Sequence, residues 1–230
     1  MIDIVIPVRP GPNEELRFAL RSLINVPHRQ VHIVGAAPSW VDRSAVRVFP
    51  QPRATQKSDT VAGHLLAACA DPEISDPFIL FNDDFYVTEP IPAVPALNRG
   101  LVVDVLTEFH DRGAASGYVA SMVDTRRRLL EHFGVEPLSF ELHLPIVVDK
   151  GLMEAAIALG EGVQRWHRRT AYGAVAGITG ERADDVKVTR PSDRIPAGPF
   201  LSTSDASFRW VRPMLRRIFP TPGPYERGTR

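Results

Sequence analysis

The feature that most constrains the fold is an alternation of short apolar runs with longer helical patterns in the first 81 residues. The runs are too short for helices, and Pro, Gly or polar residues bound them, which is typical of buried strands. The apolar runs cover residues 3–8, 30–35, 45–49 and 77–81, and the helical patterns cover 13–24 and 58–70. Such alternation predicts an α/β fold with a mostly parallel central sheet flanked by helices.

The pattern at 13–24, NEELRFALRSLI, predicts an amphipathic helix. Its apolar residues share one helical face: Leu16, Ala19, Leu20, Leu23 and Ile24. Asn13 is suited to cap this helix, and two glutamates in the first turn favour its positive end. Ser58 is a candidate cap for the helix at 58–70.

The stretch FILFNDDFYV, residues 78–87, carries the apolar run at 77–81 directly into Asp83 and Asp84. Adjacent ionised carboxylates are costly to bury. Three explanations are open: ligands for Mg²⁺ or Mn²⁺, a general acid/base pair with separated pKa values, or a simple Asp-containing turn.

Ligands of open α/β sheets bind beyond the carboxyl ends of the strands. Arg9, Asn13 and the Asn82–Asp84 trio are expected at that edge. The guanidinium groups of Arg9 and Arg17 suit a diphosphate or a base carbonyl. The basic stretch RWHRRTAYG, residues 165–173, offers Arg169 and its neighbours to a donor phosphate or to a nucleic acid backbone.

Composition excludes some function classes. Lys and Arg total 27, as do Asp and Glu, and this neutrality argues against a sequence-independent grip on nucleic acid over the whole surface, although not against a local basic groove. A single cysteine, Cys69, forbids an intramolecular disulfide. Neither a membrane span nor a signal peptide is recognisable, so we expect a cytoplasmic protein.

Four ordered blocks resemble the Stealth family of nucleotide-sugar-dependent sugar-phosphate transferases. The first block comprises NEELRFALRSL, VHIVGAAPSWV, TQKSDTVAGHLL and FILFNDDFYVTEPI. ELHLPIVVDKGLMEAA (141–156) is similar to the family's H-M-P-H block, and PFLSTSDASF followed by MLRRIFPTPGPYE is similar to its final blocks. The resemblance covers most of residues 3–226 and implies a GT-A-like nucleotide-sugar transferase fold. Because the sequence shows no internal repeat and no clear linker, we expect one domain over 1–220, with a tail at 221–230.

The chain also departs from the family pattern. IPVR stands in place of an opening T-W-V-D, Ile146 replaces the second His of H-M-P-H, and Ser204 replaces the Asn before Asp205. These changes leave ordinary glycosyl transfer open. The compact form is similar to glycosyltransferase-like proteins of actinobacterial phages, which implies a modified DNA base or a glycan as acceptor.

The resemblance implies roles for individual residues. Asp205, His143 and Asp84 are candidate catalytic groups, and Asp84, Asp83 and His143 are candidate ligands of Mn²⁺ or Mg²⁺. The candidates for the nucleotide-sugar donor are Pro7, Arg9, Arg17, Lys57, Asp59, Asn82, Asp83 and Arg169. For Lys57, Asp59 and Asp205, ordinary helix-start or turn chemistry is an alternative.

The expected function is therefore metal-dependent transfer of a sugar from a nucleotide-sugar to a hydroxyl acceptor. Sugar-1-phosphate transfer of the Stealth type is the first alternative. A catalytically inactive nucleotide- or DNA-binding relative and a nucleotidyltransferase are the others.

Overall fold

The computed structural model describes residues 1–51, 57–111, 113 and 116–228, with the backbone alone at Lys57 and Ser58. A five-stranded sheet in the order β3-β2-β1-β4-β7 forms its centre. These strands are β1 (Asp3–Val8), β2 (Val31–Gly35), β3 (Val46–Phe49), β4 (Phe78–Leu80) and β7 (Ile146–Val148). All neighbouring pairs are parallel except β4 with β7. The predicted α/β class with a mostly parallel central sheet is confirmed.

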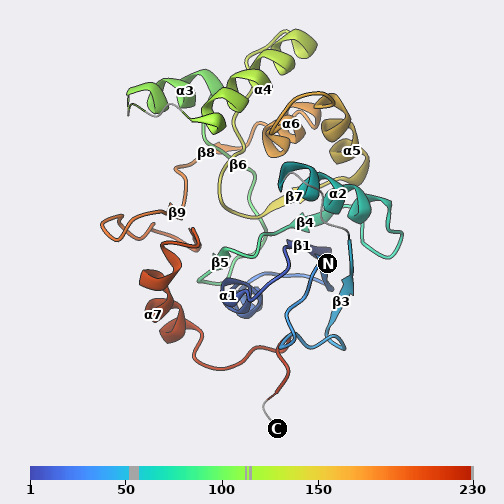
Figure 1. Ribbon diagram of the computed structural model, residues 1–230, viewed down its shortest axis with the longest axis vertical. Helices are drawn as coiled ribbons and strands as arrows, with labels where there is room; N and C mark the ends of the chain where they lie inside the picture. The colour runs from blue at the N-terminus through green and yellow to red at the C-terminus, as the bar shows by residue number, and fades with distance from the viewer. Residues whose placement is uncertain (52–56, 112, 114–115, 229–230) are drawn as a thin grey trace.

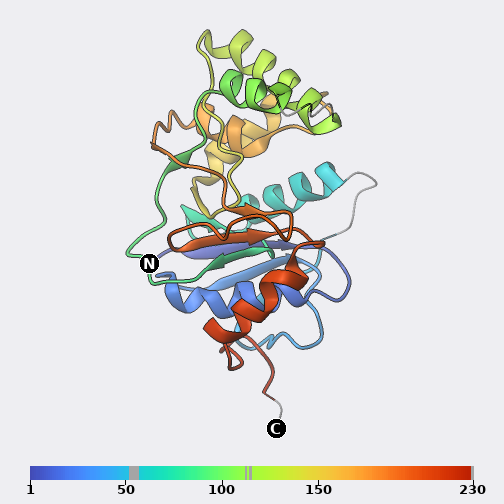
Figure 2. The ribbon, with the colours of Figure 1, turned by 90° about the vertical axis from the view of Figure 1, so that its left-hand side faces the viewer.

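Helices cover both faces of this sheet, which explains its continuous apolar strands. Figure 2 shows α1 (Glu14–Ser22) and α7 (Phe208–Ile218) on one side and α2 (Lys57–Ala70) on the other. Alternate residues of β1 serve the two layers: Ile4 and Ile6 join the cluster that includes α1 and α7. Val5 joins the cluster of α2, α5 (Lys150–Leu159) and α6 (Arg168–Val175).

A second sheet, in the order β5-β10-β9, continues from the first. Its strands are β5 (Phe85–Val87), β10 (Phe200–Thr203) and β9 (Lys187–Val188). Only Phe81 and the Asn82–Asp84 trio separate β4 from β5, so the carboxylate turn joins the two sheets. β10 runs antiparallel to β5 and parallel to β9. Lys187, on β9, is therefore two strands away from β5, the strand that follows the carboxylate turn.

The remaining elements lie at one end of the molecule. β6 (Leu97–Asn98) pairs with β8 (Glu181–Arg182), and α3 (Val102–Asp111) packs on α4 (Gly117–Phe133) far from the central sheet (Figure 1). Within the described ranges, no helix combines the length and apolar character needed to cross a membrane.

Residues 221–228, predicted as part of a tail, pack against the body of the protein. Glu226 forms a bridge with Val41, and its buried carboxylate contacts the guanidinium groups of Arg17 and Arg21. The Arg21 Nε–Glu226 Oε1 distance is 2.6 Å. This segment therefore fastens α1 to the loop after β2.

Two local predictions need correction. Helix α1 ends at Ser22, and the chain continues as a 3₁₀ turn, η1 (Leu23–Asn25). The tighter turn changes the helical phase, so Ile24 is 81% exposed instead of sharing the buried face of Leu23. Helix α2 begins at Lys57, so Ser58 lies inside its first turn and not at the capping position.

Candidate functional site

A polar pocket of about 410 Å³ lies at the carboxyl ends of β1 and β4. The N-terminal half contributes the loop after β1, the carboxylate turn and the side of α2. The C-terminal half contributes residues around His143, α6 and β9. The predicted residues that line the pocket are Pro7, Arg9, Asn82, Asp83, Asp84, His143, Arg169 and Asp205. The sheet topology thus brings these distant positions together.

Asn13 ties the carboxylate turn to the start of α1. Its Oδ1 accepts a hydrogen bond of 2.9 Å from the backbone N–H of Leu16, which confirms the predicted cap. Its Nδ2 donates to Asp83 Oδ2 at 2.5 Å. Burial, and then the charge of Asp84, raise the pKa of Asp83 above its ordinary value. Asp83 is therefore held in place and resists ionisation.

Glu15 is a pocket residue that the sequence analysis treated only as a first-turn acid. Burial raises its pKa to about 7, and the charges of Asp205, Asp83 and Asp84 act in the same direction. Its Oε1 is buried and has no hydrogen-bond partner among the described residues. A carboxyl group with a pKa near neutrality can exchange a proton at physiological pH. The burial of Glu15 results from the docking of α1 against the carboxylate turn. No pattern in the sequence therefore indicated its raised pKa.

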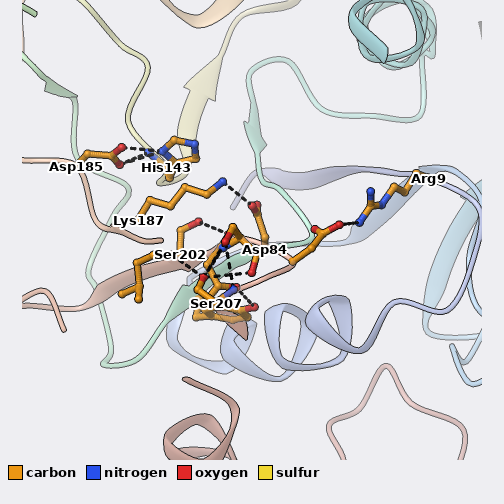
Figure 3. A network of polar contacts seen from close by, with 12 residues as sticks. Arg9, Asp84, His143, Asp185, Lys187, Ser202 and Ser207 are labelled. Carbon is orange, nitrogen blue, oxygen red and sulfur yellow. Dashed lines mark hydrogen bonds and ion pairs between the residues drawn. The ribbon is translucent and has the colours of Figure 1, made fainter. Parts of the chain in front are cut away.

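His143 is oriented by Asp185, a residue that the sequence analysis did not single out. The ring Nδ1 lies 2.9 Å from Asp185 Oδ2, and the backbone N–H of His143 donates to Asp185 Oδ1 at 3.1 Å (Figure 3). Burial favours a raised pKa for Asp185, but the hydrogen bonds and charge of His143 outweigh it and lower the pKa. A carboxylate on Nδ1 leaves Nε2 for proton exchange with a ligand.

Three basic residues from the other half of the chain line the same pocket. Lys187 Nζ lies 3.3 Å from Asp84 Oδ2. Burial lowers the pKa of Arg169 to about 10, although Glu141, Asp185 and Asp84 oppose the effect. Burial also lowers the pKa of Arg168, opposed by Glu141 and Asp59.

Arg9 and Asp205 form an ion pair at the rim, with Nη2 and Oδ2 separated by 2.6 Å. Both side chains are more than half exposed, at 56% and 73%. The hydrogen bond that Arg9 donates to Asp205 is the main cause of the raised pKa of Arg9. The pair connects the loop after β1 to the start of α7, and it is accessible to a ligand entering the pocket.

Two predicted donor-binding residues, Arg17 and Asp59, do not line the pocket. Arg17 lies outside the residues that line the pocket, with its guanidinium on Glu226 and 4.2 Å from the centre of the Trp40 ring. Asp59 is exposed at the start of α2 and acts on the pocket through its charge near Arg168. The side chain of Lys57 lies outside the described residues.

The predicted metal ligands do not form a ready-made cation site. Within the part of the chain that the structure describes, no cluster of three or more His, Cys, Asp or Glu side chains has the geometry to hold a metal ion. Each predicted ligand has another partner: Asn13 for Asp83, Lys187 for Asp84 and Asp185 for His143. The ammonium group of Lys187 lies against the carboxylate that was the leading candidate ligand. In this structure each of these side chains is therefore engaged by a protein group.

Comparisons with known proteins give no family assignment. No family model matches the chain, and no curated protein matches it. One matching solved structure is described as the crystal structure of 4-diphosphocytidyl-2C-methyl-D-erythritol synthase. The TM-score is 0.42 at 11% identity, over 93% of this chain and 97% of that one. At this level of similarity the function must be argued from the pocket itself.

Proposed function

We propose that this protein transfers a sugar from a nucleotide-sugar donor to a hydroxyl acceptor in the pocket at the carboxyl ends of β1 and β4. The observation that carries the proposal is the meeting of Arg168, Arg169 and Lys187 with the carboxylate turn at Asp83 and Asp84. Open α/β sheets bind ligands at this edge, and a diphosphate needs buried cations. The resemblance to nucleotide-sugar transferases supports the same chemistry.

The donor diphosphate would lie against Arg169 and Lys187. Arg169 presents a planar guanidinium, which matches phosphate oxygens in pairs, and Lys187 adds a compact positive charge. These cations stabilise the charge that develops on the leaving nucleoside diphosphate. Asn82 and the backbone near Pro7 border the same space and would orient the sugar or ribose.

His143 is the candidate base for the acceptor hydroxyl. The hydroxyl oxygen forms a bond to the anomeric carbon, and its proton passes to Nε2 of His143. The bond between that carbon and the phosphate oxygen breaks, and its electron pair leaves with the nucleoside diphosphate. Asp185 fixes the ring and stabilises the imidazolium that forms. Asp205, at the rim with Arg9, would orient an acceptor, which is a glycan or a modified base in DNA.

The identity of the released nucleotide tests the reaction class. Incubation with a panel of sugar nucleotides should release a nucleoside diphosphate, as expected for glycosyl transfer. Attack at the β-phosphorus would release a nucleoside monophosphate instead and would indicate sugar-1-phosphate transfer. Pyrophosphate from an NTP and a sugar phosphate would indicate nucleotidyl transfer. Nucleotide binding without any release would indicate an inactive binding relative.

Asp185 provides the test of the proposed base. Asp185→Asn should lower kcat by at least about tenfold and leave the KM for the donor nearly unchanged, because it acts through His143 on proton transfer. Asp184→Asn, an exposed neighbour, is the matched control and should leave both values unchanged. Equal unfolding temperatures for the two variants exclude misfolding. A higher KM with an unchanged kcat for Asp185→Asn would contradict the positioning role.

A further inference from the structure

We propose that the pocket binds its diphosphate without a divalent cation, and that the ammonium group of Lys187 takes the place of the metal beside Asp84. The reaction in which this would serve rests on the proposed function above. The binding of a nucleoside diphosphate can be measured separately from that reaction.

The position of Lys187 is set by backbone pairing. Ser202 of β10 pairs with Lys187 on one side and with Phe85 on the other, and Phe85 follows Asp84 directly. The register therefore delivers the lysine to the carboxylate turn. Its side chain is only 21% exposed, and Figure 3 shows it extended toward Asp84. A partly buried lysine so placed is a fixed part of the pocket.

The state of Asp84 argues against a metal at this position. One of its oxygens, Oδ2, already faces the Lys187 ammonium at 3.3 Å. A divalent ion on the same carboxylate would repel that ammonium in a partly buried site. The other oxygen, Oδ1, is buried without a hydrogen-bond partner among the described residues. It would accept a hydrogen bond from a sugar or ribose hydroxyl while Oδ2 holds the lysine.

Arg169 supplies the second reason. Among the described residues, no carboxylate lies within ion-pair distance of its guanidinium, whose hydrogen bond goes to the uncharged carbonyl of Leu144. Its Nε is buried without a hydrogen-bond partner in that set. The guanidinium also stacks on Phe85, 5.5 Å from the ring centre. A buried guanidinium with incomplete neutralisation favours an incoming anion.

Several acidic residues of the pocket are already engaged by other protein groups. Asp205 is paired with Arg9, Asp84 is paired with Lys187, and Asp83 is bound by Asn13. Burial lowers the pKa values of Arg168 and Arg169, and Glu141 is a carboxylate that opposes this in both. Arg169 therefore remains the pocket cation that a diphosphate would neutralise most directly.

Calorimetric titration with UDP, ADP, CDP and GDP tests the inference, first in excess EDTA and then with Mn²⁺ or Mg²⁺. At least one nucleotide should bind in EDTA, with a Kd within about threefold of its value with metal. Lys187→Met, which keeps most of the stem but removes the charge, should weaken that binding at least tenfold. Arg190→Gln, an exposed neighbouring cation, should leave it unchanged. Arg169→Gln is a second variant for the case in which Lys187→Met does not fold.

Binding that appears only with the metal would overturn the inference. Full affinity in Lys187→Met, or no nucleoside diphosphate binding in either condition, would also overturn it. The proposed function fails separately: EDTA-resistant, Lys187-dependent nucleotide binding without sugar transfer would retain this inference and reject the transferase. Sugar transfer that requires Mn²⁺ would retain the transferase and reject this inference.

Discussion

The environment of Glu15 in the folded chain differs from the one that its sequence position suggests. In the sequence it is one of two adjacent glutamates at a helix start. In the structure Glu14 is exposed, whereas Glu15 lines the pocket and its pKa rises to about 7. The positive end of a helix favours a carboxylate. Burial beside Asp83, Asp84 and Asp205 outweighs that benefit.

The raised pKa of Glu15 predicts a pH-dependent stability. The folded chain keeps the Glu15 proton up to about pH 7, whereas the unfolded chain releases it near 4.5, the ordinary pKa of a glutamate. Stability is therefore lost as the pH rises through this interval. Glu15→Gln cannot ionise, so above pH 7 it should exceed the wild type in free energy of unfolding by about 1–3 kcal/mol. Chemical denaturation at pH 4.5, 6 and 8 measures the difference.

Glu14→Gln is the control, and its difference from the wild type should stay within about 0.5 kcal/mol at every pH. A Glu15→Gln effect of the same size at pH 4.5 and pH 8 would contradict the assignment, because the effect must follow ionisation.

The candidate site was partly visible at this scale. The strand end at Asn82–Asp84 and the loop at Arg9 were predictable, because a strand edge collects ligand-binding groups. Asp185 and Lys187 were not, because Asp185 lies in a loop and Lys187 begins a two-residue strand whose pairing depends on distant residues. Arg17 looked equivalent to Arg9, but its partner Glu226 lies 209 positions away.

At the scale of elements, the C-terminal segment, residues 221–228, holds α1 in place. Glu226 is buried and receives hydrogen bonds from Arg17, Arg21 and the backbone N–H of Gly223. Arg227 N–H also donates to the Trp40 carbonyl at 2.8 Å. The segment was predicted as a tail because its Pro and Gly residues resemble a loop. Its order depends on contacts with α1 that local sequence does not express.

Removal of the Glu226 charge should weaken the attachment of the C-terminal segment to α1 and lower the free energy of unfolding. Glu226→Gln leaves Arg17 and Arg21 without their buried carboxylate, so we expect a loss of about 2–4 kcal/mol at pH 7. Burial favours a raised pKa for Glu226, but its hydrogen bonds with Arg21, Gly223 and Arg17 lower the pKa below its ordinary value. The stabilisation should therefore fade as the pH falls below about 4.

Urea denaturation at pH 7 and pH 3.5 measures this loss, with Glu131→Gln as the control. Glu131 forms an exposed pair with Arg127 on α4 and should contribute less than about 0.5 kcal/mol. Equal losses for the two variants at pH 7 would show that the C-terminal segment does not hold α1.

The first four strands were predictable because each is a short apolar run. The sheet buries β1, β2 and β4 almost completely and the edge strand β3 in part. β6, β8 and β9 have two residues each, so they carry no periodic signal. The turn of η1 could not be predicted from the heptad-like spacing before it, and Ile24 is exposed as a result.

At the scale of the whole molecule, both halves of the chain contribute charged groups to one pocket. Residues before 90 supply Glu15, Asp83 and Asp84, and residues after 140 supply Arg168, Arg169 and Lys187. Figure 1 shows the intervening α3 and α4 carried away from this meeting point. A ligand with both anionic phosphates and sugar hydroxyls would contact both halves, and its binding would stabilise the complete fold.

Binding of an intact sugar nucleotide is the most direct test of the central claim that this pocket holds a nucleotide-sugar donor. We predict saturable binding to the wild-type chain by calorimetry. Arg169→Gln should weaken it at least tenfold, and Arg127→Gln, exposed on α4, should not change it. Failure of every sugar nucleotide to bind, or full affinity in Arg169→Gln, would contradict the claim.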